Sequence, residues 1–163
     1  MKDLKKVYAP EEGTVYFYPY ALSSSYGNFL IIDHGKGIHS LLGHLKTFNP
    51  ELQSQDPVKR GDFLGFIGNS SKYKMPIHLH WSVFRRIETI WDRFGGKRAV
   101  FSGKPYRVNR KQFSIDPADK IAEGWDHPCI GKITSPWGPR EMKSPFDYHY
   151  GIDYSMLRLR KEG

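Results

Sequence analysis

The chain has 163 residues, which is enough for one domain with a substantial core and too few for two comfortable ones. Aromatic residues make up 15% of it and charged residues 26%, so the composition is that of a globular protein and excludes a disordered chain. It contains no run of apolar residues long enough for a membrane-spanning helix. The net charge of +8 favours polyanionic surroundings such as nucleic acid, anionic lipid or an anionic cell-wall polymer.

The first 85 residues are predicted to form strands separated by turns. The charged start, residues 1–6, is followed by no apolar signal-peptide core, so we expect either no export by that route or a sequence that begins after such a segment. Runs of β-branched and aromatic residues predict strands at 13–19, 29–32 and 38–45. Residues 47–54 are mostly polar and predict a loop or a short helical turn, and residues 58–68 alternate around glycines, as in a bent strand.

Residues 77–84 form the clearest strand pattern in the sequence. Alternate residues of a strand point to opposite faces. One face therefore carries His78, His80, Ser82 and Phe84, and the other carries Ile77, Leu79, Trp81 and Val83.

The stretch from 86 to 131 differs in character from the first half. Residues 86–94 could make a short amphipathic helix. Residues 116–123 have an acidic first turn and an early proline, which predicts a second short helix. Strand-and-turn patterns return at 133–140 and 148–155, so the fold class is all-β with minor helix.

Two groups among the seven histidines could carry chemistry. His78 and His80 lie on one strand face, close enough to share a site. His149 and Asp153, four residues apart on an extended or bent backbone, are a suitable pair of Zn²⁺ ligands. With one histidine from elsewhere they would give a three-ligand site with a fourth position for water. Each pattern also occurs by chance, so neither indicates a site by itself.

The remaining candidates are weaker. We expect His34 and His39, in and after a turn, to be structural or exposed, and His127 to be irrelevant to chemistry. The lone Cys129 excludes an internal disulfide and a cysteine-built zinc site. The sequence contains no His-Glu-x-x-His helix and no Gly-x-Ser-x-Gly motif.

Together, the motifs resemble those of the lysostaphin-type (LytM-like) zinc metallopeptidases. That family carries His-x-Gly-x-Asp and, later in the chain, His-x-His. Residues 135–140 followed by 149–153 resemble the family's opening segment. The rest of the family pattern is matched, in its order and spacing, by residues 7–15, 26–28, 32–35, 43–45, 58–62, 67–69 and 78–83.

The order of the two halves is reversed with respect to that family. His-Tyr-Gly-Ile-Asp ends this chain, whereas in the family it comes first. We therefore expect a single, circularly permuted peptidase domain over 1–163: residues 1–85 as the family's C-terminal part, 86–131 as the connecting segment and 132–163 as its N-terminal part. A fragment of a tandem array, or a C-terminal domain swap between two chains, would produce the same order.

The resemblance implies an all-β fold with a mostly antiparallel sheet, a groove-lining zinc site and minor helix in the connecting segment. It implies that His149, Asp153 and His80 bind Zn²⁺ and that His44 and His78 are catalytic. The function would be that of a zinc endopeptidase acting on peptidoglycan stem or cross-bridge peptides, as a monomer in the cell envelope, outside the cell or borne by a phage.

Two alternatives remain. A non-catalytic binding or regulatory member of the same fold would be expected to lack ligands, but all three are present here. A basic nucleic-acid-binding β-domain would fit the charge, yet no nucleic-acid-binding motif occurs, so no nucleic acid is expected as a partner.

Overall fold

A computed structural model describes residues 3, 5–19, 26–85, 88–91, 97–100, 114–139, 148–149 and 151–155. At 88–91, 97–100, 139 and 148 it describes the backbone alone. In chain order the strands are β1 (Lys6–Tyr8), β2 (Gly13–Pro19), β3 (Asn28–Asp33), β4 (Ile38–Phe48), β5 (Pro57–Val58), β6 (Phe63–Ile67), β7 (His78–Arg85), β8 (Glu88–Trp91), β9 (Lys97–Val100), β10 (Ser114–Ile115), β11 (Lys132–Ser135), β12 (Gly138–Pro139), β13 (Tyr148–His149) and β14 (Ile152–Ser155). The described part of the chain has one helix, α2 (Pro117–Ala122). This confirms the all-β fold class.

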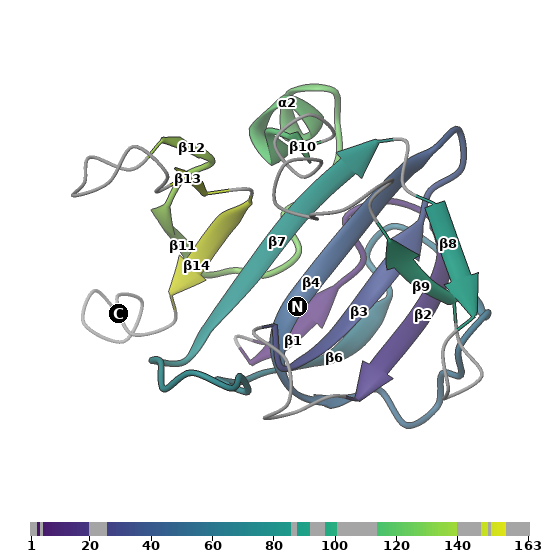
Figure 1. Ribbon diagram of the computed structural model, residues 1–163, viewed down its shortest axis with the longest axis horizontal. Helices are drawn as coiled ribbons and strands as arrows, with labels where there is room; N and C mark the ends of the chain where they lie inside the picture. The colour runs from purple at the N-terminus through teal and green to yellow at the C-terminus, as the bar shows by residue number, and fades with distance from the viewer. Residues whose placement is uncertain are drawn as a thin grey trace.

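The main sheet is antiparallel, with strands in the order β11-β14-β7-β4-β3-β2-β5. Figure 1 shows β7 and β4 side by side through the middle of the molecule, with β14, from the end of the chain, along the outer side of β7. The long strand β4 pairs with β7 through its first half and with β6 through its second half. The sheet thus brings the last described residues against the strand predicted to carry the paired histidines.

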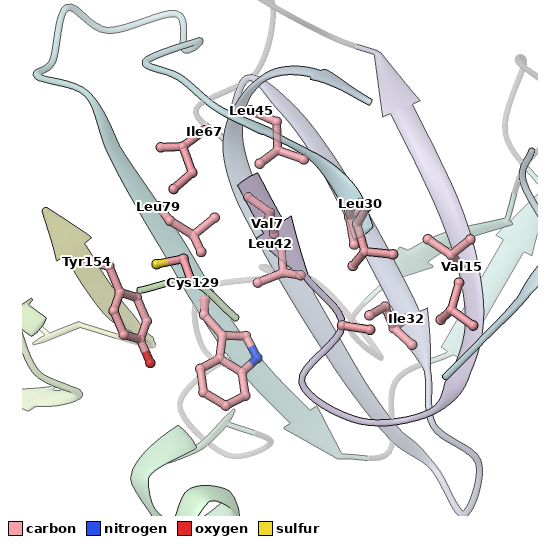
Figure 2. Close-up of a cluster of buried hydrophobic side chains, with 14 of the residues drawn as sticks. Val7, Val15, Leu30, Ile32, Leu42, Leu45, Ile67, Leu79, Cys129 and Tyr154 are labelled. Carbon is pink, nitrogen blue, oxygen red and sulfur yellow. The ribbon is translucent and has the colours of Figure 1, made fainter. Parts of the chain in front are cut away.

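The alternation of residues along β7 separates a core face from a site face. Leu79, Trp81 and Val83 are fully buried in the larger hydrophobic cluster, as expected from the sequence. Figure 2 shows Leu79 beside Leu42 and Val7, with Tyr154 of β14 and Cys129 at the edge of the same cluster. A smaller cluster, which includes Phe84, lies on the opposite face, the face that also carries His80 and Ser82. Burial of one large apolar side chain contributes roughly 1.5–3 kcal/mol to the stability of the fold, so packing on both faces stabilises β7.

Three local predictions need correction. The prediction of a helix over 86–94 is wrong for the described residues, because Glu88–Trp91 forms β8 and pairs with β9 as a hairpin. Thr89, Ile90 and Trp91 are residue types that favour a strand once a partner strand is available. Residues 86–87 and 92–94 lie outside the described residues. The single bent strand predicted at 58–68 is divided into β5 and β6 by a turn in which Gly61 has φ +88°. Strand β4 extends to Phe48, into the predicted loop.

The helix predicted at 116–123 is confirmed as α2. Asp116 caps it by accepting a hydrogen bond from the backbone N–H of Ala118 at 2.9 Å, and Pro117 occupies the first turn, where its missing N–H costs nothing. No helix among the described residues is long and apolar enough to cross a membrane.

Candidate metal centre and active site

Asp153 and His80 form the centre of the site. The pairing of β14 with β7 sets Asp153 directly opposite His80, and side chains of directly opposed residues share one face of the sheet. The carboxylate Oδ1 of Asp153 lies 3.0 Å from Nδ1 of His80. Both side chains are largely shielded from solvent. The neighbours of Asp153 on β14, Ile152 and Tyr154, point to the opposite face and pack into the core, which fixes the register of β14 on β7.

His149 completes a cluster of three potential ligands. Its Nε2 lies 3.3 Å from Oδ1 of Asp153, and its ring centroid lies 5.2 Å from that of His80. The candidate ligand atoms of the three residues all lie within 4.8 Å of one another. His149 stands on β13, which pairs with β12, and the chain bends at Gly151 before β14 begins. The bend brings both residues of the His-x-x-x-Asp motif to one point.

The hydrogen bonds of His149 fix its tautomer. Nδ1 lies 3.0 Å from the carbonyl oxygen of Pro136, which can only accept, so Nδ1 carries the proton. Nε2 of the neutral ring therefore turns its lone pair toward the Asp153 carboxylate. Two acceptors face each other at 3.3 Å, an arrangement that a cation or an extra proton between them would stabilise. Two imidazole nitrogens and one carboxylate oxygen are ligands that zinc sites use. A ligand histidine in such sites donates its other N–H to a carbonyl or carboxylate, as His149 does to Pro136.

The electrostatics favour an ionised carboxylate at Asp153. Burial alone would raise the pKa of the Asp153 carboxyl, but the close contacts of its oxygen with the His149 and His80 rings outweigh burial and hold that pKa well below its ordinary value. Burial lowers the pKa of His80. The site thus offers a negatively charged carboxylate beside two imidazole rings.

His44 and His78 lie next to this cluster. Their ring centroids are 4.5 Å apart, and the ring of His44 is 6.1 Å from that of His80. His44 stands where β4 leaves β7 for β6, with φ +66°, and its backbone N–H donates to the carbonyl of Tyr26 at 2.7 Å. This irregularity in the strand lets the His44 side chain project beside the start of β7.

Both of these rings are anchored by the loop between β6 and β7. Nδ1 of His44 donates to the Ser70 carbonyl at 2.9 Å, and Nδ1 of His78 donates to the Pro76 carbonyl at 2.8 Å. Each ring therefore keeps its Nε2 for another partner. Burial lowers the pKa of His44 to about 4, so its imidazole is neutral at pH 7.

The site also contains residues that the sequence did not assign to it. The ring of Tyr26 lies 5.3 Å from that of His80 and 6.4 Å from that of His44. Ser82 Oγ lies 2.5 Å from Nε2 of His80. Strand alternation already placed Ser82 on the His80 face, but nothing in the sequence marked it as a partner.

The other histidines lie elsewhere. His34 hydrogen-bonds the Glu12 carbonyl at 2.7 Å and Ser40 Oγ at 2.8 Å, and His39 is buried within the sheet. His127 contacts the Tyr154 hydroxyl at 2.9 Å. None of these three residues belongs to the cluster of His80, His149 and Asp153.

The antiparallel sheet thus presents two histidines and an aspartate as a cluster that could hold a metal ion, with two further histidines beside it. The model of peptidase family M23 matches residues 1–92, and the chain belongs to that family as a LytM-like domain. The match includes His44, His78 and His80, whereas His149 and Asp153 lie outside it.

Relatives with described activities match a shorter stretch of the chain than the family model does. The chain is 38% identical over 56 residues to the DD-carboxypeptidase/endopeptidase Mpg of Neisseria meningitidis serogroup B (strain ATCC 13091 / M2091), and equally to Mpg of Neisseria gonorrhoeae (strain ATCC 700825 / FA 1090). The match covers 34% of this chain and 12% of the relative, so the chain corresponds to a small part of those proteins.

Two solved structures are also similar. LytU is 25% identical with a TM-score of 0.47, over 74% of this chain and 69% of that one. A zinc-containing peptidase from Vibrio cholerae is 24% identical with a TM-score of 0.42, over 60% of this chain and 26% of that one.

Proposed function

We propose that this protein is a zinc-dependent endopeptidase that hydrolyses peptide bonds of peptidoglycan. The observation that carries the proposal is the cluster of His80, His149 and Asp153, whose ligand atoms converge within 4.8 Å, with His44 and His78 at its edge. Membership of a peptidase family supports hydrolysis as the reaction.

Zn²⁺ would be held by Nδ1 of His80, Nε2 of His149 and the carboxylate of Asp153. When bound, the ion supplies Lewis acidity, which polarises the scissile carbonyl and lowers the pKa of water. The carbonyl of Pro136 accepts a hydrogen bond from Nδ1 of His149, which leaves Nε2 as the atom that would bind the ion. The carboxylate of Asp153 offsets part of the positive charge.

His44 and His78 would move the protons of the reaction. With Nδ1 tied to the carbonyl of Ser70, neutral His44 presents the lone pair of Nε2 and can accept a proton from the attacking water. His78, whose ring lies 4.5 Å away, can hydrogen-bond the developing oxyanion or pass a proton to the leaving amine. Both rings are held by backbone carbonyls, which keeps them oriented before substrate arrives.

Peptidoglycan as the substrate rests on the relatives and on charge. The Mpg proteins are described as DD-carboxypeptidase/endopeptidases, which supports a stem or cross-bridge peptide as the target. The net charge of +8 suits an anionic wall polymer. The loop that anchors the two histidines also exposes Lys72, Lys74 and Tyr73 beside the site. We expect such a protein in the cell envelope, outside the cell or in a phage particle.

We further propose that the domain is circularly permuted within one chain and acts as a monomer. The pairing of β14 with β7 in a single chain supports this arrangement. In that case residues 1–85 and 132–163 are the two family parts, and residues 86–131, which include α2, connect them. A protein rebuilt with 132–163 placed ahead of residue 1 is expected to fold and bind zinc with the same stoichiometry.

The experiment is a digestion of purified peptidoglycan by the zinc-loaded protein, with released amino groups and fragment masses as the readout. We expect hydrolysis that a chelator abolishes and zinc restores, and none by Asp153→Asn. A protein that binds zinc at this cluster without cleaving any wall peptide would instead be a non-catalytic member of the fold.

A further inference from the structure

Ser82 occupies a distinctive position behind the proposed zinc ligand His80. Its Oγ lies 2.5 Å from Nε2 of His80, while Nδ1 of the same ring faces Asp153 at 3.0 Å. Ser82 itself is completely buried on β7. Both ring nitrogens of His80 therefore have a partner: Nδ1 contacts the Asp153 carboxylate within the cluster, and Nε2 contacts the Ser82 hydroxyl on the other side of the ring.

The chemistry of a hydroxyl makes this contact compatible with two tautomers of His80. A serine hydroxyl can both donate and accept, whereas the Asp153 carboxylate can only accept. Without a cation, the proton of the ring lies on Nδ1 and points to Asp153, and Ser82 donates to Nε2. With zinc on Nδ1, the proton must lie on Nε2, and Ser82 accepts it.

The backbone at Gly151 packs closely against this contact. A Cβ at Gly151 would lie 2.7 Å from Ser82 Oγ and 2.8 Å from Cε1 of His80. The bend between β13 and β14 therefore lies directly against the His80–Ser82 contact.

We propose that Ser82 is the positioning residue of the zinc site, which holds the ring of His80 in place and accepts its Nε2–H when Nδ1 binds the ion. The inference rests on the proposed zinc site. Partners of this kind fix ring orientation and raise ligand basicity, and their loss typically costs 10- to 100-fold in metal affinity. Ser82→Ala removes the acceptor and would leave the Nε2–H of the zinc-bound state buried without a partner.

Ser40 provides the matched control. It is equally buried on the neighbouring strand β4, and its hydroxyl bonds Trp81 at 3.1 Å and His34 at 2.8 Å, away from the cluster. Ser40→Ala removes the same atom from the same sheet but touches no proposed ligand.

The experiment is zinc titration of the wild type, Ser82→Ala and Ser40→Ala in competition with a chromophoric chelator at pH 7. We expect Ser82→Ala to bind zinc about 10- to 100-fold more weakly than the wild type and Ser40→Ala to match the wild type. Equal affinity of all three, or an equal loss in both variants, would overturn the role of Ser82. A wild type that binds no zinc would overturn the proposed function as well.

A second measurement needs no variant. Long-range proton–nitrogen NMR spectra of the wild type report which nitrogen of His80 is protonated. We expect Nε2–H in the zinc-loaded protein and Nδ1–H in the metal-free protein. Protonated Nδ1 in the zinc-loaded protein would contradict the inference, whether or not Ser82→Ala folds.

Discussion

Asp153 lies opposite His80 across the β7–β14 pair, with Oδ1 3.0 Å from Nδ1, although the two residues are 73 positions apart in the chain. Long-range strand pairing therefore builds the site. The carboxylate also faces Nε2 of His149 at 3.3 Å, so a single oxygen atom joins both imidazoles. The consequences for metal binding, catalysis and stability can be tested separately.

Removal of a proposed ligand should abolish zinc binding without unfolding the sheet. Asp153→Asn keeps the size of the side chain but removes its charge, and His80→Ala removes a donor. We expect the zinc content of each, measured by atomic emission after dialysis, to fall from one ion per chain to well below half, with loss of peptidase activity. The matched change His39→Ala, at a buried histidine outside the cluster, should retain zinc if folded; full zinc in both ligand variants would contradict the assignment.

Substitution at His44 should impair the reaction while zinc stays bound. His44 has φ +66°, so Asn, which tolerates this conformation, is a better replacement than Ala. We expect His44→Asn to retain one zinc ion and to lose about 10²- to 10⁴-fold in kcat, the usual contribution of a positioned acid or base. His78→Ala should behave in the same way. Wild-type turnover in both variants would exclude a catalytic role for the pair.

Acid should begin to destabilise the protein at a pH above the ordinary pKa values of carboxyl groups. Burial lowers the pKa of His34 and of His44 to about 4, below the ordinary value of 6.5. Between these values the unfolded chain binds more protons than the folded one, so stability is lost as pH falls from about 6.5 to about 4.

Urea unfolding of the metal-free protein across that pH range measures this effect. We expect the free energy of unfolding to fall with decreasing pH, with an uptake on unfolding of up to about one proton for each histidine. His34→Gln, remote from the cluster, should reduce the slope. A free energy independent of pH between 4 and 6.5 would show that these rings are not buried as neutral groups.

The lysines of the β6–β7 loop should contribute to substrate binding. Lys72 and Lys74 are exposed on the loop whose carbonyls anchor His44 and His78, and residues 69–77 include no acidic side chain. We expect Lys72→Gln/Lys74→Gln to raise KM on peptidoglycan by about two- to tenfold, with kcat unchanged and less effect at high salt. The control Lys36→Gln/Lys59→Gln makes the same change of charge at other exposed lysines and should leave KM unaltered.

The sequence predicted the two faces of β7 better than it predicted residues 88–91. Alternation along residues 77–84 correctly assigned Leu79 to the core and His80 to the opposite face, because a two-residue period leaves no other choice. The family resemblance then joined His80 to His149 and Asp153. The strand at 88–91 was mistaken for a helix because a short apolar pattern fits both periods and its partner strand cannot be seen locally.

Features that depend on the exact backbone were not predictable. The left-handed conformation of His44 arises where β4 changes partner from β7 to β6, which no local pattern encodes. The contact of Ser82 with His80 lies against Gly151, and this close approach follows from the register of β14 on β7. Both are products of long-range pairing.

The central claim is that one chain supplies all three ligands of a single zinc ion. Anomalous diffraction at the zinc edge, from crystals of the zinc-loaded protein, tests it most directly. The account predicts one peak bonded to Nδ1 of His80, Nε2 of His149 and the carboxylate of Asp153 of the same chain. A peak at any other position, or one whose ligands come from two chains, would contradict it.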